Sequence, residues 1–164
     1  MPLDPIREAR RQWVAHGWAD AADGMAMVTS LVRVHQLLQA RIDAVLRPLD
    51  LTFARYEVLR LLAFSARGEM PMARVGSLLQ VHPASVTSAV GRLEAQGYVA
   101  RTRGETDRRV VLAAITPAGR VIVERATDGL NDAVFTDPGL PDADVATLTR
   151  LFDGFRAAAG DPVD

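Results

Sequence analysis

Residues 84–116 read ASVTSAVGRLEAQGYVARTRGETDRRVVLAAIT, and this stretch decides the fold. Its first half has the apolar spacing of a helix, with Val86, Val90 and Leu93 on one face. Short hydrogen-bond donors and one arginine face the other way: Ser85, Thr87, Ser88 and Arg92. After Gly97, two runs with strand character flank a charged loop, which predicts a β-hairpin. A helix followed by an arginine-tipped hairpin is typical of a winged helix that binds DNA.

The residues just before this stretch predict a second short helix, from Met70 to Leu79. Such a helix is too short to be stable alone. Gln80-Val81-His82 then form a tight turn, and Pro83 opens the next helix. Two short helices joined by a turn of three or four residues make a helix-turn-helix.

Further helices are predicted on both sides of this region. The first begins at the cap Asp4 and runs toward His16, and a longer one covers about residues 22–46. Thr52 and Thr116 cap two more, of which the second extends to about residue 135. The last covers about residues 142–159, and 137–139 form a turn. The expected fold is therefore mainly α with a small β wing.

We expect two regions in this fold. Residues 49–116 form the winged helix-turn-helix, and residues 1–48 with 117–164 form a helical dimerisation region. Apolar residues follow one another at helical spacing in both flanking segments: Met27, Leu31, Val34, Leu38, Ile42 and Val45 in the first, and Val145, Leu148, Leu151, Phe152 and Phe155 in the second. The small central region cannot cover both stripes, so they predict a homodimer.

The overall charge of −1 argues mildly against a nucleic-acid partner, but the charge is uneven. From Arg92 to Arg109 five arginines face three acids, whereas from Asp137 onward six aspartates face two arginines. All 19 basic residues are arginine, which suits bidentate contacts and narrow DNA grooves.

Several other classes of protein lack support in the sequence. The absence of cysteine excludes disulfides and thiolate metal sites, and the three histidines are too scattered to suggest a metal or catalytic site. There is no phosphate-binding glycine loop and no nucleophile elbow, so we expect neither an enzyme nor a cofactor. No apolar run approaches the ~20 residues of a membrane span, and no signal peptide is seen, so we expect a cytoplasmic protein.

Three runs in the sequence resemble the MarR family of bacterial transcriptional regulators: residues 49–59 (LDLTFARYEVL), residues 91–99 (GRLEAQGYV), and Asp107-Arg108-Arg109 before residues 115–119 (ITPAG). The resemblance covers roughly residues 22–159 and implies a homodimeric winged helix-turn-helix repressor. In that family the terminal helices intertwine to form the dimer. Many members release DNA when a small aromatic or acyl ligand binds.

The candidate DNA contacts come from the helix and the hairpin: Ala84, Ser85, Thr87, Ser88, Arg92, Arg101, Arg103, Asp107, Arg108 and Arg109. The resemblance implies that Asp107 orients the wing arginine, Arg109, which enters the minor groove. The alternatives are an ordinary solvated helix face, a surface ion pair for Arg92 and a charged turn without function. Arg101 and Arg103 are either phosphate contacts or solvated.

The candidate effector residues are mapped by the same resemblance. They are His35, Gln39, Tyr56 and Arg60, with Trp18 and Arg11 from the N-terminal extension. A histidine or tyrosine on an otherwise apolar helix is more often a core residue whose polar group is satisfied, which is the alternative for each. Trp18 stacks on an aromatic ligand or fastens the extension to the dimer, and Arg11 binds an anionic group such as a coenzyme A phosphate or is solvated. The expected effector is an aromatic carboxylate or its coenzyme A thioester.

The near-neutral charge leaves one alternative function open, a winged helix that binds another protein and not specific DNA. The expected partners are otherwise a double-stranded DNA operator, a second copy of the chain and a small-molecule effector. The sequence does not identify the operator or the effector, or decide between repression and activation.

Overall fold

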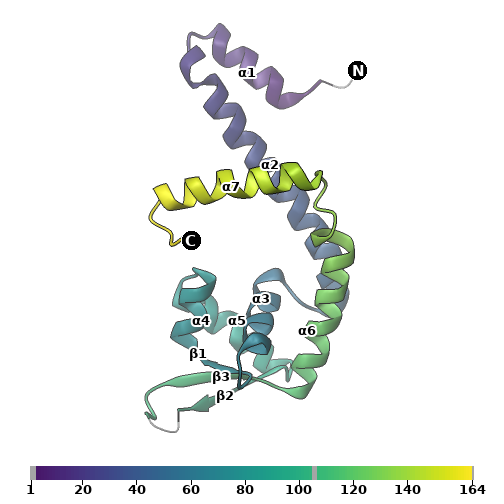
Figure 1. The fold of residues 1–164 in the computed structure, drawn as a ribbon, viewed down its shortest axis with the longest axis vertical. Coiled ribbons are helices and arrows are strands. Elements are labelled where there is room, and N and C mark those ends of the chain that lie inside the picture. Colours follow the sequence, from purple (N-terminus) through teal and green to yellow (C-terminus); the bar gives the residue numbers. More distant parts are fainter. Residues whose placement is uncertain (1–2, 105–106, 164) are drawn as a thin grey trace. The chain divides into compact units, whose positions relative to one another are not determined.

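The computed structural model describes residues 3–104 and 107–163. Glu105 and Thr106, at the predicted tip of the wing, lie outside the described residues. The chain divides into two compact units, Met1–Asp43 and Ala44–Asp164. The elements, labelled in Figure 1 where there is room, are α1 (Pro5–Ala15), α2 (Ala19–Leu46), the 3₁₀ turn η1 (Arg47–Leu49), α3 (Phe53–Phe64), β1 (Glu69–Pro71), α4 (Met72–Leu79), α5 (Pro83–Ala95), β2 (Val99–Arg103), β3 (Val111–Ile115), α6 (Pro117–Leu130), the π-helical turn η2 (Asn131–Phe135) and α7 (Asp142–Ala158).

The first unit is a helical hairpin of α1 and the greater part of α2. Asp4 caps α1 as predicted, since its Oδ1 accepts hydrogen bonds from the backbone N–H groups of Ile6 and Arg7. An ion pair of 2.6 Å between Arg10 Nε and Asp23 Oδ1 joins α1 to α2. The second helix begins at Ala19, three residues before the predicted start.

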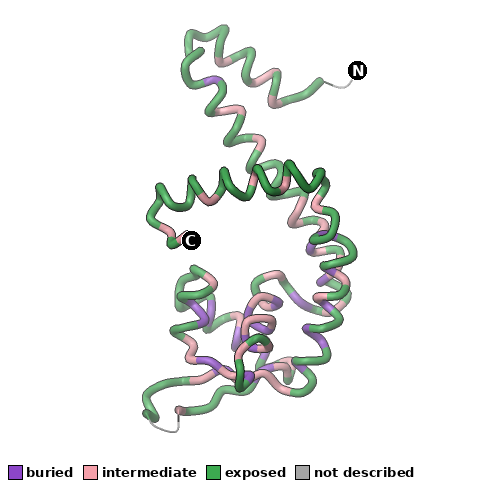
Figure 2. Tube along the Cα trace, in the orientation of Figure 1, coloured by how far each residue is buried: buried purple, intermediate pink, exposed green. Residues whose placement is uncertain are grey.

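Most residues of this hairpin are exposed, as Figure 2 shows. The exposed residues include members of the apolar stripe predicted for α2: Met27 is 56% exposed, Leu31 46% and Val34 49%. Helix α7 in the second unit likewise has no buried residue. Its apolar side chains Phe152 and Phe155 are exposed. The single chain therefore leaves apolar faces uncovered in both units.

The core of the second unit is formed by α3, α4, α5, α6 and the sheet (Figure 2). Its fully buried side chains are aliphatic and come from every one of these helices: Leu59, Leu62, Val75, Val90, Leu93, Val123 and Leu130. The predicted caps are confirmed, because Thr52 Oγ1 accepts from the N–H of Arg55 and Thr116 Oγ1 from the N–H of Gly119. The predicted continuation of α6 to Phe135 is confirmed too, although its last five residues are π-helical.

The sheet has three antiparallel strands in the order β1-β3-β2. In β2 and β3, Val99 pairs with Ile115 and Arg103 with Val111, which confirms the predicted hairpin. The assignment of Met70 and Pro71 to a helix was wrong. They belong to β1, where Met70 pairs with Ala113, and the helix begins only at Met72. Pairing with the free edge of β3 satisfies backbone groups that a short helix start would leave open.

Among the described residues, no helix combines the length and the apolar character needed to cross a membrane.

Candidate nucleic-acid interface

Helix α5 presents a polar face because its apolar face is anchored in the core. Val86 is 2% exposed, and Val90 and Leu93 are fully buried. The predicted contact residues Ala84, Ser85, Thr87, Ser88 and Arg92 are all exposed. The division of α5 into a buried and an exposed face is the one that the sequence predicts. Short polar groups and one arginine on an exposed helix face match the donors and acceptors of base edges and phosphates.

The turn before α5 fixes where this face begins. Gln80 adopts the left-handed conformation (φ 53°) and ends α4. His82 then caps α5, with its Nδ1 accepting from the N–H of Ala84 at 3.1 Å. Thr87 Oγ1 donates to the carbonyl oxygen of Pro83, so the hydroxyl of Thr87 is left as an acceptor toward other molecules.

A groove of about 750 Å³ runs along this face of α5. Its walls come from α5 and from the segment around the start of α3: Asp50, Thr52, Ala54, Arg55, Ala84, Ser85, Ser88, Ala89, Arg92, Ala95 and Gln96. Arg55 Nη1 donates to Gln96 Oε1 at 3.0 Å, and Gln96 Nε2 donates to the carbonyl oxygen of Asp50 at 2.8 Å. These bonds fix the second wall against the end of α5.

Neither Arg55 nor Gln96 was predicted as a site residue. The two residues are 41 positions apart and only the fold brings them together. The Arg55 side chain is 16% exposed, so it supports the groove more than it offers a free cation. The sequence signals near this wall were the cap Thr52 and the family resemblance of residues 49–59 and 91–99, none of which predicts the contact between Arg55 and Gln96.

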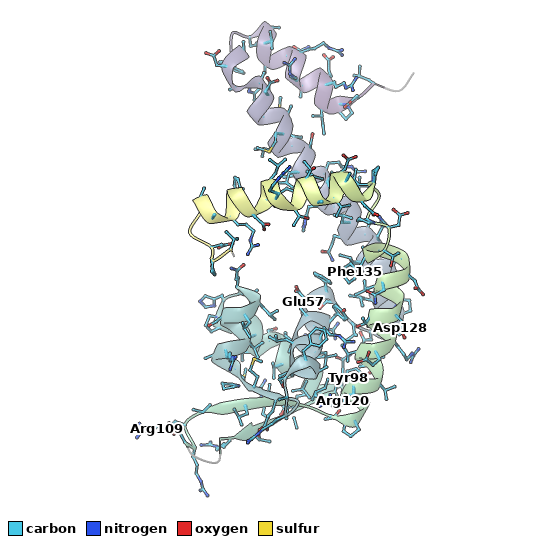
Figure 3. All side chains as sticks on the ribbon, viewed as in Figure 1. Glu57, Tyr98, Arg109, Arg120, Asp128 and Phe135 are labelled. Atoms are coloured by element: carbon cyan, nitrogen blue, oxygen red, sulfur yellow. The ribbon has the colours of Figure 1, made fainter. Side chains whose placement is uncertain are left out.

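The hairpin loop has an internally bonded backbone. The N–H of Gly104 donates to the carbonyl oxygen of Val110 at 2.9 Å, and the N–H of Val110 donates to that of Asp107 at 3.1 Å. Asp107 Oδ1 accepts from the backbone N–H of Arg109 at 2.9 Å. In this structure Asp107 therefore orients the backbone of Arg109, and Figure 3 shows Arg109 at the outer end of the hairpin.

The predicted wing arginines differ in their surroundings. Arg108 and Arg109 are exposed, and no ion pair within the described residues includes either. Arg103 Nη1 donates to the carbonyl oxygen of Arg108 at 3.3 Å, which braces the loop. Arg101 is instead paired with Glu94 on α5. Within the described part of the loop, the two arginines at the tip are thus exposed without an ion pair, whereas Arg101 near the base is engaged.

Two predicted effector residues, Tyr56 and Arg60, lie together in the second unit. Both contact Thr127 of α6, since Tyr56 Oη is 3.1 Å and Arg60 Nε is 3.1 Å from Thr127 Oγ1. Arg60 also pairs with Glu124 at 3.0 Å and lies 5.0 Å from the centre of the Phe64 ring. The hydrogen bond from Arg60 holds the pKa of Glu124 below its usual value. Tyr56 and Arg60 therefore join α3 to α6.

The other four predicted effector residues belong to the first unit. His35 is exposed, and Gln39 Nε2 donates to Asp43 Oδ1 at 2.9 Å. Trp18 is 55% exposed and makes an edge-to-face contact with Trp13, with ring centres 5.4 Å apart. Arg11 Nε donates to Glu8 Oε2 at 2.9 Å. Each of these contacts lies within the first unit, and the role of the six residues in effector binding stays a prediction.

The part of the chain that the structure describes contains no group of three or more His, Cys, Asp or Glu side chains that could hold a metal ion.

Comparison with known proteins places this geometry in context. The MarR family model matches residues 49–110. A MarR family transcriptional regulator from Streptomyces coelicolor is 42% identical, with a TM-score of 0.77 over 87% of this chain and 99% of that chain. A second one from the same organism, solved in complex with DNA, is 25% identical, with a TM-score of 0.75 over 86% of this chain and 89% of that chain. An HTH-type transcriptional repressor from Mycobacterium bovis is 30% identical over 105 residues, 64% of this chain and 74% of that protein.

Proposed function

This chain belongs to the MarR family of transcriptional regulators, and we propose that it is a homodimeric repressor which leaves its operator when a small effector binds. The family consists of DNA-binding regulators and not of enzymes. One observation carries the proposal: the exposed polar face of α5 lies in the same unit as a hairpin with exposed arginines at its outer end. We therefore propose a cytoplasmic location, because a repressor acts on the bacterial chromosome.

The proposed DNA contacts divide by element. Ser85, Thr87, Ser88 and Arg92 on α5 enter the major groove, where short polar side chains and arginine read base edges. Ala84 allows the start of α5 to approach the DNA backbone closely. Arg109 enters the neighbouring minor groove, with Arg103 and Arg108 on phosphates. The regulator from Streptomyces coelicolor that was solved in complex with DNA supports DNA as the partner.

The homodimer is proposed from the uncovered apolar faces of α2 and α7. Leu31 and Leu151 are 46% and 61% exposed in the single chain, and each has apolar neighbours at helical spacing. Apolar patches of this kind are typical of interfaces between subunits. A two-fold dimer requires an operator that is itself nearly palindromic, with half-site centres about one helical turn, ~10 bp, apart. In this proposal residues 1–48 and 117–164 form the dimerisation region.

The effector is proposed to be an aromatic carboxylate or its coenzyme A thioester. Within the second unit, Arg60 and Tyr56 offer a guanidinium and a phenol on the helix α3, which packs directly on α5 in the core. An anion that draws Arg60 away from Glu124 and Thr127 loosens the joint between α3 and α6. Such an effector shifts the population only if it binds the released form more tightly than the DNA-binding form.

The DNA-binding part is tested by selecting duplexes from a random-sequence library with the wild-type protein and measuring fluorescence anisotropy over a series of salt concentrations. We expect a pseudo-palindromic sequence to be enriched, and the logarithm of its binding constant to fall linearly with the logarithm of salt concentration. Equal affinity for the selected duplex and a scrambled one would instead favour the alternative, a winged helix that binds another protein.

The effector part is tested by titrating benzoate-type acids and their coenzyme A thioesters into the complex with the selected duplex. We expect release of DNA, and a higher half-maximal concentration for Arg60→Ala. Arg125→Ala, which removes an exposed arginine from α6, is the matched control. An unchanged half-maximal concentration for Arg60→Ala would contradict the assignment of Arg60 while leaving DNA binding untouched.

A further inference from the structure

Arg101 lies on the inner face of the wing. Successive residues of a strand point to opposite faces, so Val99, Arg101 and Arg103 share one face of β2. Val99 is 2% exposed, which shows that this face is directed to the interior of the unit at the start of the strand. Arg101 continues that face toward α5, and its partner across the hairpin is the fully buried Ala113 of β3.

The Arg101 guanidinium lies against three residues of α5. Its Nε lies 3.3 Å from Glu94 Oε2, and its Nη2 donates to the carbonyl oxygen of Thr87 at 3.3 Å. The third residue is Gly91, where a Cβ atom would lie 3.1 Å from Nη2. Residues 87, 91 and 94 fall on one face of a helix, so the guanidinium lies lengthwise along α5.

The positive charge of Arg101 is favourable for a second reason, which is the position of Glu94 on α5. Glu94 lies in the last turn of α5, where the negative end of the helix dipole disfavours a carboxylate. Arg101 offsets that repulsion. Its side chain is 34% exposed and that of Glu94 44%, so the pair contributes little to overall stability. It does connect the side of β2 directly to α5.

We propose that Arg101 is a positioning residue that holds the wing at a fixed angle to the DNA-reading helix, and that it does not contact phosphate. The inference rests on the proposed DNA-binding function. The Arg101 guanidinium is ion-paired with Glu94 and donates to the Thr87 carbonyl oxygen, so its charge and its Nη2 group are already engaged within the protein. A hairpin held at its base presents Arg108 and Arg109, at its far end, in the orientation that they need on DNA, so less freedom of the wing is lost on binding.

A double-mutant cycle between Arg101 and Glu94 tests the proposal, with the selected duplex as the probe. We expect Arg101→Ala and Glu94→Ala each to weaken binding about three- to fivefold, and the double variant to weaken it no further. The pair of substitutions Arg101→Glu and Glu94→Arg keeps the net charge and should restore part of the affinity. A purely electrostatic role for Glu94 predicts the opposite sign, since loss of a negative charge favours DNA binding.

The salt dependence separates positioning from contact. We expect the slope of log affinity against log salt concentration to be unchanged in Arg101→Ala, and to be less steep by about one in the control Arg108→Ala, which removes a proposed phosphate contact. A slope reduced by about one in Arg101→Ala, together with tighter binding by Glu94→Ala, would show that Arg101 contacts phosphate and overturn the proposal.

A second measurement needs no DNA. Amide hydrogen exchange of β2 and β3 in the free protein should become faster in Arg101→Ala and Glu94→Ala, but not in Arg92→Ala. Unchanged exchange in Arg101→Ala would also overturn the proposal. Failure of the proposed function has a different signature, because the wild-type protein itself would then show no salt-dependent binding to any selected duplex.

Discussion

The backbone of Gly119, in the first turn of α6, lies directly against the carbonyl group of Tyr98, with no room for a Cβ atom between them. Figure 3 shows Tyr98 beside the start of α6. The Thr116 side chain reinforces this junction, since its Oγ1 donates to the carbonyl oxygen of Gly97 at 2.7 Å. The end of the DNA-reading helix and the start of α6 are thereby joined through backbone atoms.

Gly119→Ala should therefore destabilise the protein. The new methyl group would meet the Tyr98 carbonyl and would lie 2.8 Å from Ile115 Cγ1. Overpacking of this kind costs about 1–3 kcal/mol, which exceeds the gain of up to about 1 kcal/mol that alanine brings to a helix. Urea denaturation at one fixed protein concentration measures the difference. Gly154→Ala in α7, where nothing lies within 4 Å, is the control and should stabilise slightly.

The wing loop gives a second prediction. Asp107→Ala removes the acceptor for the N–H of Arg109, whereas Asp107→Asn keeps a carbonyl oxygen in its place. We expect Asp107→Ala to lower the affinity for the selected duplex by about 1 kcal/mol and Asp107→Asn to change it much less. Arg109→Ala should cost about 1–3 kcal/mol. If Asp107→Asn lowers the affinity for the duplex as much as Asp107→Ala does, DNA binding depends on the carboxylate charge and not on the hydrogen bond within the turn.

Glu57 predicts how stability changes with pH. Partial burial in α3 raises its pKa above the usual value, because desolvation disfavours the carboxylate. The folded state therefore holds the proton more tightly than the unfolded state. This contribution to stability is complete below the unfolded pKa of 4.5 and is lost as the pH rises through the raised value.

Glu57→Gln should accordingly raise the melting temperature at pH 7 and have a smaller effect below pH 4, where Glu57 is mostly protonated in both states. Thermal melts of the variant and the wild type across this pH range measure the difference. Equal shifts at both pH values would show that the titration of Glu57 plays no part.

The oligomeric state gives a fourth prediction. Sedimentation at micromolar concentration should yield about twice the mass of one chain, because the apolar faces of α2 and α7 need a partner. Leu31→Glu and Leu151→Glu should shift the equilibrium toward the monomer. Leu78→Glu, which changes an equally exposed leucine in α4 of the DNA-binding region, should leave the dimer intact. A folded wild-type monomer would contradict the dimer.

The elements that the sequence predicts well carry strong local signals. The exposed face of α5 follows from the spacing of Val86, Val90 and Leu93, and the helix starts follow from the caps Asp4, Thr52 and Thr116. These signals arise from side chains within a few residues of the backbone groups that they satisfy. Local chemistry is therefore enough to place them.

The features that could not be predicted from the sequence depend on contacts between different helices and strands. Strand β1 has only three residues, too few for a periodic pattern, and exists because Met70 pairs with Ala113. The partner of Arg101 was likewise unpredictable, since it lies across the turn at Gly97 on another element. The bonds from Arg60 to α6 depend on packing of helices more than 60 residues apart.

The central claim is that two copies of α5 and its wing bind one operator. Its most direct test is a hydroxyl-radical footprint of the wild-type protein on the selected duplex. We predict two protected half-sites with centres about one helical turn, ~10 bp, apart, and loss of binding when about half a turn of DNA is inserted between them. Protection of a single site, or binding that tolerates the insertion, would contradict the account.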